Sequence, residues 1–200
     1  MEAQTRVSHT STNQVAPTET TSMNRFPIGA SVIYNFHGKC TVAAIESRVI
    51  NEQTVEFYKL EVQKSVLSRS TRLDPAIWVP IATAQEHGLR LPVDETEVDT
   101  ILKTISSREY YFQLQESWPV VQSKLDAVIK SEGCIGLAKV VSYLHVLKRK
   151  QIVPTTEANR MSDLTMRLLL RELSEALKLP IRSVEAEIAK ALRQKLIPDT

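Results

Sequence analysis

The chain has 200 residues, with 25 Lys and Arg against 23 Asp and Glu and a formal net charge of +2. Charge this evenly balanced excludes a uniformly basic, histone-like nucleic-acid binder, although it permits a local basic patch. A hydrophobic content of 42% suffices for one large core or two small ones. The two cysteines, Cys40 and Cys134, lie far apart and outside any Cys/His array, which argues against a zinc site or a disulfide framework and predicts free thiols.

No apolar run approaches the roughly 18 residues that a membrane-spanning helix needs, and the N-terminus lacks the apolar segment of a secretory signal. These features predict a soluble, cytoplasmic protein. The first part of the chain consists mostly of Ser, Thr, Asn, Gln and Pro. Such a composition cannot bury enough apolar area to offset its ordering entropy, so we expect a disordered tail over residues 1–24.

Residues 25–92 have the pattern of short strands. The segment from Phe26 to Arg48 is rich in β-formers around a His37-Gly38 turn, and Val55–Val62 alternates with a period of two. The expected strands cover residues 31–34, 41–45, 55–62 and 76–79, with a hairpin loop at 51–53. Gly88 is expected to end one or two helical turns that follow. Four or five short strands within this length predict a small, strongly bent sheet or barrel.

From Asp94 onward the pattern becomes helical. Acidic residues at 94–97 suit a first helical turn, Ser117 can cap a second helix, and later segments repeat apolar residues every three or four positions. Five helices are expected, starting near residues 94, 117, 137, 155 and 180. They predict a compact all-α domain over residues 93–200. The predicted fold class is therefore α+β, with two domains and the sheet in the first, over residues 25–92.

Motifs for catalysis are missing from the sequence. The four histidines, at positions 9, 37, 87 and 145, are scattered and none has metal-ligand spacing. No G-x-S-x-G, P-loop or G-x-G-x-x-G motif occurs. The sequence therefore predicts a protein that is not an enzyme and has no catalytic residue, metal or cofactor.

Trp118 stands at the expected start of a helix, between Ser117 and Pro119. Its ring can pack between helices, or it can project outward and insert at a distorted step of the DNA minor groove.

Lys148-Arg149-Lys150 is the only run of three like charges. At a helix C-terminus such a run either complements the helix dipole in solvent or contacts phosphates.

The segment Leu173–Leu192 has the sequence pattern of a helix-turn-helix, with one apolar helix ending at Pro180 and another starting near Ser183. A helix-turn-helix would place its last helix in a DNA major groove. Glu185 and Glu187 would then lie where phosphates approach, which argues against this interpretation.

Several motifs follow one another in the order and spacing of a known family. The first unit contains Phe26, Gly29, Val32, Tyr34 and Gly38 and ends with Ala44-Ile45-Glu46-Ser47-Arg48. Later motifs are Phe57-Tyr58-Lys59-Leu60, Val79-Pro80, Glu86-His87-Gly88-Leu89-Arg90, Trp118 and the helix Met161–Leu173. Over residues 26–192 the chain resembles the CarD/CdnL family of bacterial transcription factors, whose N-terminal module is shared with transcription-repair coupling factors.

The resemblance implies a Tudor-like N-terminal module that binds the β subunit of RNA polymerase. It also implies a helical domain that reaches promoter DNA at the upstream edge of the bubble, where a tryptophan wedges into the minor groove and stabilises the open complex. Carried over, Arg48 is a polymerase contact and Trp118 is the wedge. Phe57 and Trp78 are also expected to contact polymerase. The expected DNA contacts are Trp118, Lys148, Arg149, Lys150 and Arg160.

The chain departs from the family pattern at positions that bear on both contacts. Asn35 stands where the family usually has Pro, and Trp78 stands where a basic residue is common. Pro119-Val120-Val121 follows the tryptophan in place of an arginine pair, and only Arg160 remains of two basic residues before Met161.

Three hypotheses follow from these observations. The first is a CarD-type regulator that binds polymerase and promoter DNA. The second is a helix-turn-helix regulator that binds DNA directly. The third is an adaptor that binds polymerase or another protein without contacting DNA, an alternative that the lost arginines favour.

Overall fold

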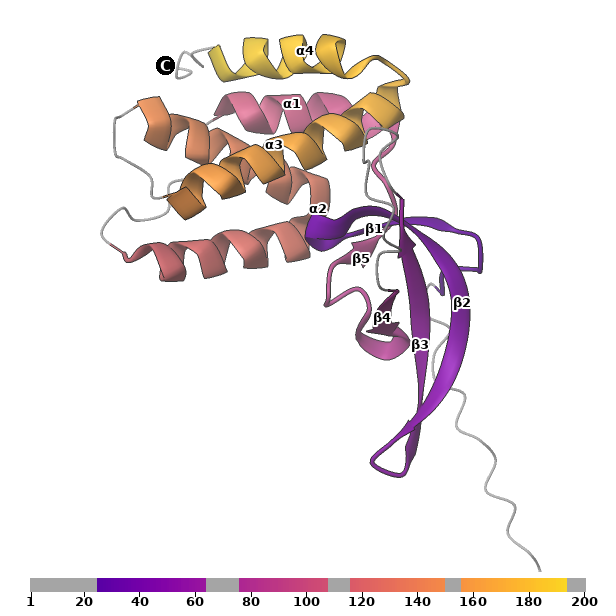
Figure 1. Ribbon diagram of the computed structural model, residues 1–200. Helices are drawn as coiled ribbons and strands as arrows, with labels where there is room; N and C mark the ends of the chain where they lie inside the picture. The colour runs from indigo at the N-terminus through magenta and orange to yellow at the C-terminus, as the bar shows by residue number, and fades with distance from the viewer. Residues whose placement is uncertain (1–24, 64–75, 108–115, 150–155, 194–200) are drawn as a thin grey trace, which may run out of the picture.

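The computed structural model describes residues 25–63, 76–107, 116–149 and 156–193. Within these ranges the chain is α+β, with a five-stranded antiparallel sheet in the N-terminal half and four α-helices in the C-terminal half. The helices gather at one end, and a long hairpin of the sheet projects away from them (Figure 1). The tail predicted over residues 1–24 lies outside the described residues.

The sheet has the strand order β4-β3-β2-β1-β5. Its strands are β1 (Ser31–Tyr34), β2 (Gly38–Ile50), β3 (Gln53–Val62), β4 (Ile77–Pro80) and β5 (Leu89–Arg90). All four neighbouring pairs are antiparallel. The sequence predicted the first four strands, whereas β5, a two-residue strand that pairs with β1, was not among them.

The predicted strand at 41–45 was shorter than β2. Beyond Ile45 the strand continues to Ile50 although its side chains become exposed, because the ladder with β3 extends to the end of the hairpin. Asn51 and Glu52 form the connecting turn with φ angles of 49° and 64°. Two successive positive φ angles are typical of a type I′ turn, whose twist matches that of the flanking strands.

The helices are α1 (Val98–Ser107), α2 (Trp118–Arg149), α3 (Thr156–Leu177) and α4 (Ile181–Arg193). Asp94 caps the short 3-10 turn Glu95–Glu97 that leads into α1: its carboxylate accepts a hydrogen bond from the Thr96 amide at 2.8 Å, and the Glu97 carboxylate accepts one from the Asp94 amide. This reciprocal arrangement is a capping box, which agrees with the acidic first turn predicted here.

The five predicted helices correspond to α1, the two halves of α2, α3 and α4. The second and third expected helices are the two halves of α2, which meet at Gly133 with φ 60° and ψ −124°. Only this residue leaves the helical conformation, so the connection between these two predicted helices is a sharp kink. Figure 1 shows the two halves meeting beside the sheet and their outer ends on the side away from it.

The buried residues form two clusters. One lies under the sheet, around Val42, Tyr58 and Leu60. The other joins all four helices, around Leu125, Leu144 and Leu169. No helix within the described residues is long and apolar enough to cross a bilayer.

Candidate functional site

The face of the sheet opposite its core brings together the three residues predicted to bind RNA polymerase, which are Arg48, Phe57 and Trp78. Phe57 lies opposite Glu46 in the ladder and Lys59 lies opposite Trp78. Tyr58, between them, is buried in the sheet core. Because side chains alternate between the two faces of a strand, Phe57 and Lys59 lie on the other face, together with Trp78. Phe57 is only 9% exposed there, whereas Lys59 and Trp78 are partly exposed. We call Arg48, Phe57, Lys59 and Trp78 the stacked cluster.

Two cations share the ring of Trp78 in the stacked cluster. The guanidinium carbon of Arg48 lies 3.6 Å from the centroid of the Trp78 ring and 5.9 Å from that of Phe57. The ammonium nitrogen of Lys59 lies 5.6 Å from the Trp78 centroid. These distances fall within the range of cation–π attraction. The rings therefore hold the Arg48 side chain against the sheet.

The donors of Arg48 remain accessible. Its side chain is 44% exposed, and its one ion pair within the described residues is a loose 3.8 Å contact with Glu46. Stacking occupies the face of a guanidinium and leaves its N–H groups, which lie in the plane, available for a bidentate contact with a carboxylate. The stacked cluster can therefore present an oriented arginine to an acidic partner.

Lys59 was not predicted as a site residue. It lies two positions after Phe57 on a strand with a clear period of two, so the alternation already placed it on the same face. Ile50, which is 44% exposed, follows Arg48 at the same spacing near the hairpin end.

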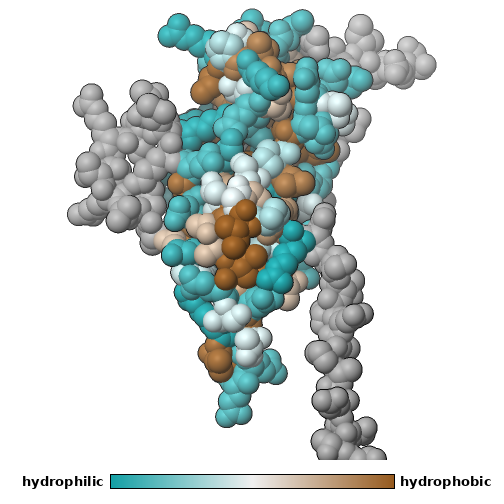
Figure 2. Space-filling view, turned by 90° about the vertical axis from the view of Figure 1, so that its right-hand side faces the viewer, coloured by the Kyte–Doolittle hydropathy of each residue, from teal (hydrophilic) through white to brown (hydrophobic). Residues whose placement is uncertain are grey.

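On the side of the molecule in Figure 2, hydrophobic side chains form small separate groups within a largely hydrophilic surface. A partner docking on such a surface needs polar contacts as well as apolar ones.

Trp118 is the first residue of α2. It is half-buried and packs against the helical core, and its indole nitrogen is buried without a hydrogen-bond partner among the described residues. Pro119 and Val120 beside it are exposed, whereas Val121 is buried in the core. Of the two alternatives for Trp118, the structure thus shows packing against helices for part of the ring.

Three further predicted site residues lie at the ends of helices. Lys148 and Arg149 are exposed at the end of α2, and Arg160 is exposed in the first turns of α3. Lys150 lies outside the described residues. These helix ends and the start of α2 all lie at the end of the helical half that is distant from the sheet (Figure 1). A hollow of about 390 Å³ lies between the first half of α2 and the start of α3, and Arg160 lines it.

Arg167 and Arg171 follow Arg160 along α3, with the exposed Asp163 between Arg160 and Arg167 and with Arg171 at the cleft beside the sheet. Spacings of seven and four residues place the three arginines on one side of α3, and all three are exposed. No ion pair of theirs is found within the described residues. The sequence contained this signal as a helical periodicity of basic residues, but only Arg160 was predicted.

The described histidines do not form a site. His37 stacks on Tyr34 with ring centroids 5.5 Å apart, and the carbonyl of His87 accepts a hydrogen bond from the Asn35 amide group at 2.5 Å. Within the described ranges, no three His, Cys, Asp or Glu side chains are grouped as a metal site would require. Cys40 and Cys134 are free and buried.

Comparison with known proteins gives no match, either to a protein-family model or to a curated protein. Membership of the CarD/CdnL family is therefore a proposal that depends on the order and spacing of the motifs in the chain.

Proposed function

We propose that this protein is a transcription regulator of the CarD type that is not an enzyme. In this proposal the sheet binds the β subunit of RNA polymerase and the helical half stabilises the promoter open complex. The observation that carries the proposal is the stacked cluster, in which Arg48 lies 3.6 Å from the Trp78 ring with its donors still accessible. An arginine that is already oriented loses less side-chain entropy on binding, which favours affinity.

The proposal includes a Tudor-like identity for the sheet and a division into two domains, at residues 25–92 and 93–200. Two features support it: the long, curved antiparallel hairpin of β2 and β3 (Figure 1), and the separation of buried residues into a sheet cluster and a helical cluster.

Asn35, where the family usually has Pro, has a local structural reason. Its φ angle is 41°, which a proline ring cannot adopt. Its side-chain amide donates to the carbonyl of His87, so it ties the turn after β1 to the turn before β5. This departure therefore concerns the internal bracing of the sheet and leaves the stacked cluster unchanged.

Trp78 changes the docking surface itself. Where a basic residue would add a second charge for the partner, Trp78 instead supplies a ring that holds Arg48 and Lys59. Aromatic residues and arginine are both enriched at the centres of protein interfaces. We propose that docking here depends on one oriented arginine and an aromatic surface.

The DNA contact in this proposal uses Trp118 and the arginines of α3. Arg160, Arg167 and Arg171 can contribute phosphate contacts in place of the arginine pair that is absent after the tryptophan. Each phosphate contact adds about 0.9 to the slope of log affinity against log salt. Loss of all three arginines would therefore flatten that slope by roughly three units.

A pull-down of RNA polymerase with the intact chain tests the first half of the proposal, and failure to capture polymerase would refute it. Arg48→Glu is expected to weaken capture strongly, because it reverses the charge at the centre of the stacked cluster. Arg193→Glu, at the end of α4, makes the same charge change away from that cluster and serves as the matched control. Equal capture by both variants would remove Arg48 from the interface.

Open-complex lifetime tests the second half. Trp118→Ala is expected to shorten the lifetime while the helical content measured by circular dichroism stays unchanged. If the variant unfolds, the role of Trp118 is packing. An unchanged lifetime with polymerase bound would favour the adaptor function. The burial of Val121 also supports that function, because this position, in the segment that stands in place of the family's arginine pair, is part of the core. A gel shift with DNA alone would reveal a direct DNA-binding regulator.

A further inference from the structure

The sheet and the helical half are joined at a seam that contains an ion pair between residues 82 positions apart. Arg90 on β5 donates from both terminal nitrogens to the carboxylate of Glu172 on α3, and the bond to Oε2 is 2.7 Å long. The same carboxylate accepts a hydrogen bond from the Val93 amide at 3.1 Å. The side chain of Glu172 is only 4% exposed. Two groups from the segment that leads out of the sheet, Arg90 and the Val93 amide, therefore compensate its charge.

The α2 kink makes room for this pair. A Cβ atom at Gly133 would lie 2.6 Å from Nε and 2.7 Å from Cδ of Arg90. Gly133 also has a φ angle of 60°, which favours glycine. The Arg90 side chain thus crosses the kink of α2 to reach α3, so that one arginine links β5, α2 and α3.

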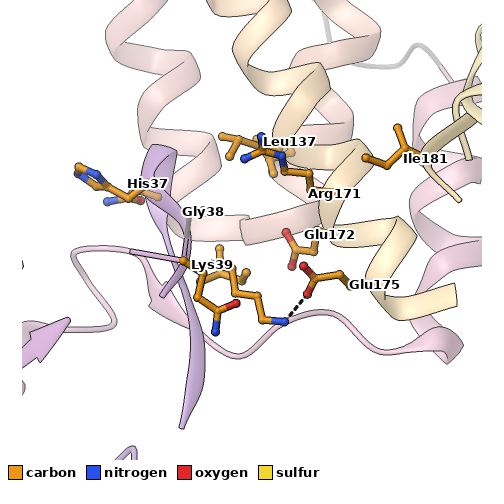
Figure 3. Close-up of a pocket in the computed structure, with 12 residues that line it drawn as sticks. His37, Gly38, Lys39, Leu137, Arg171, Glu172, Glu175 and Ile181 are labelled. Carbon is orange, nitrogen blue, oxygen red and sulfur yellow. Dashed lines mark hydrogen bonds and ion pairs between the residues drawn. The ribbon is translucent and has the colours of Figure 1, made fainter. Parts of the chain in front are cut away.

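A second ion pair at the seam differs in depth. The ammonium group of Lys39 on β2 lies 2.5 Å from the carboxylate of Glu175, one turn after Glu172, as Figure 3 shows. Its side chains are 32% and 50% exposed. A lysine cannot make the bidentate, oriented contact with a carboxylate that an arginine makes. Exposed ion pairs also contribute little to stability. Lys39–Glu175 is therefore a natural comparison for the buried pair.

Apolar packing does not close the seam completely. Leu168 approaches Gly38 and Phe36 packs against the helical core, but the sheet and helical clusters stay separate. A cleft of about 280 Å³ opens between them, with Ile33 and Ile181 among its lining residues (Figure 3). Beside this gap, the bidentate pair of Arg90 and Glu172 has a fixed geometry that constrains the angle between the two halves.

We propose that Arg90 and Glu172 are positioning residues that lock the sheet and the helical half into one rigid body. Removing either partner leaves a buried charge uncompensated and frees the helices to reorient about the connection at residues 91–93. The consequence for transcription rests on the proposed function: the lock sets where Trp118 lies when the stacked cluster is docked on polymerase. The rigidity itself can be measured on the isolated protein.

The test measures a distance distribution between two spin labels by pulsed electron paramagnetic resonance. Labels at Ser47→Cys on the hairpin and Ala186→Cys on α4 occupy exposed positions in the two halves, while both native thiols are buried. The parent chain is expected to give one narrow distribution. Glu172→Gln and Arg90→Lys are expected to lose it, and Glu175→Gln, the matched control, is expected to keep it.

Several outcomes would overturn the proposal. A broad distribution in the parent would do so, and so would narrow distributions in both seam variants. Loss of folding in both variants, seen by circular dichroism, would assign the pair to stability of the fold and not to orientation.

A transcription assay adds a separate readout. At equal occupancy of polymerase, Glu172→Gln is expected to shorten open-complex lifetime by roughly 2- to 30-fold with unchanged affinity for polymerase. An unchanged lifetime despite a broadened distribution would overturn the positioning role. If the parent chain does not bind polymerase, the proposed function fails and the result of the distance measurement still stands.

Discussion

Replacing Trp78 by Leu tests the stacked cluster most directly. The change removes the ring and keeps an apolar side chain at the same place in β4. Arg48, at 3.6 Å and 44% exposed, is expected to lose about 1 kcal/mol of cation–π attraction, and Lys59, at 5.6 Å, about 0.5 kcal/mol. Truncating an aromatic anchor at an interface costs about 2 kcal/mol or more. That cost corresponds to a roughly 30-fold weaker affinity for polymerase.

A double-mutant cycle separates the stacking from other effects of the substitution. Urea unfolding of Trp78→Leu, Arg48→Met and the double variant is expected to give a coupling energy of about 1 kcal/mol. A second cycle with Lys59→Met is expected to give about half of that. Trp78→Phe, which keeps a ring, serves as the control and is expected to retain most of the affinity for polymerase.

Coupling below about 0.3 kcal/mol would refute the claim that the ring holds Arg48, since independent sites already add to within that margin. Full coupling in the unfolding cycle together with unchanged polymerase affinity would contradict the proposed docking role of the stacked cluster. It would show that the stack stabilises the sheet but takes no part in docking.

Three further predictions concern local chemistry. Burial raises the pKa of Cys40 to about 11 and also raises the pKa of Cys134, so both thiols should resist a thiol reagent at about pH 8 until the chain unfolds; rapid labelling of the native protein would contradict this. Glu52→Gly should raise the free energy of unfolding in urea by about 0.5–1 kcal/mol, which is the left-handed penalty less the entropic cost of glycine. Hydrogen bonds from Thr96 lower the pKa of Asp94. The stability that Asp94 adds should therefore be complete at neutral pH and vanish as the pH falls through its folded-state pKa, so Asp94→Ala should lower the melting temperature at pH 7 but not at about pH 2.

Much of the fold could be predicted from short stretches of sequence. The period of two in Val55–Val62 identified β3, and the acidic turn beginning at Asp94 marked the start of the helical half. Gly88, the expected stop, has a φ angle of 81°. These features depend on residues within a few positions of one another, so the local pattern carries the information.

Errors arose where local and distant interactions compete. The third helix was predicted to start near residue 137, but the helical conformation already resumes after Gly133, and both halves of α2 pack into the same core. Likewise β2 continues through exposed residues because β3 supplies a hydrogen-bonding partner. In both cases packing or pairing with another element extended a structure that the local sequence appeared to end.

By itself the sequence determined the alternation of strands and the amphipathic helices, and it pointed to Arg48, Phe57, Trp78 and Trp118 as candidate contact residues. Only the tertiary structure decided that Arg48 and Trp78, thirty positions apart, stack on each other, and that Arg90 reaches Glu172 across the kink of α2. The physical reason is that side-chain periodicity is set by backbone geometry within one element, whereas contacts between elements depend on strand register and on how helices pack. Strand register and helix packing therefore determine both the candidate docking surface and its position relative to Trp118.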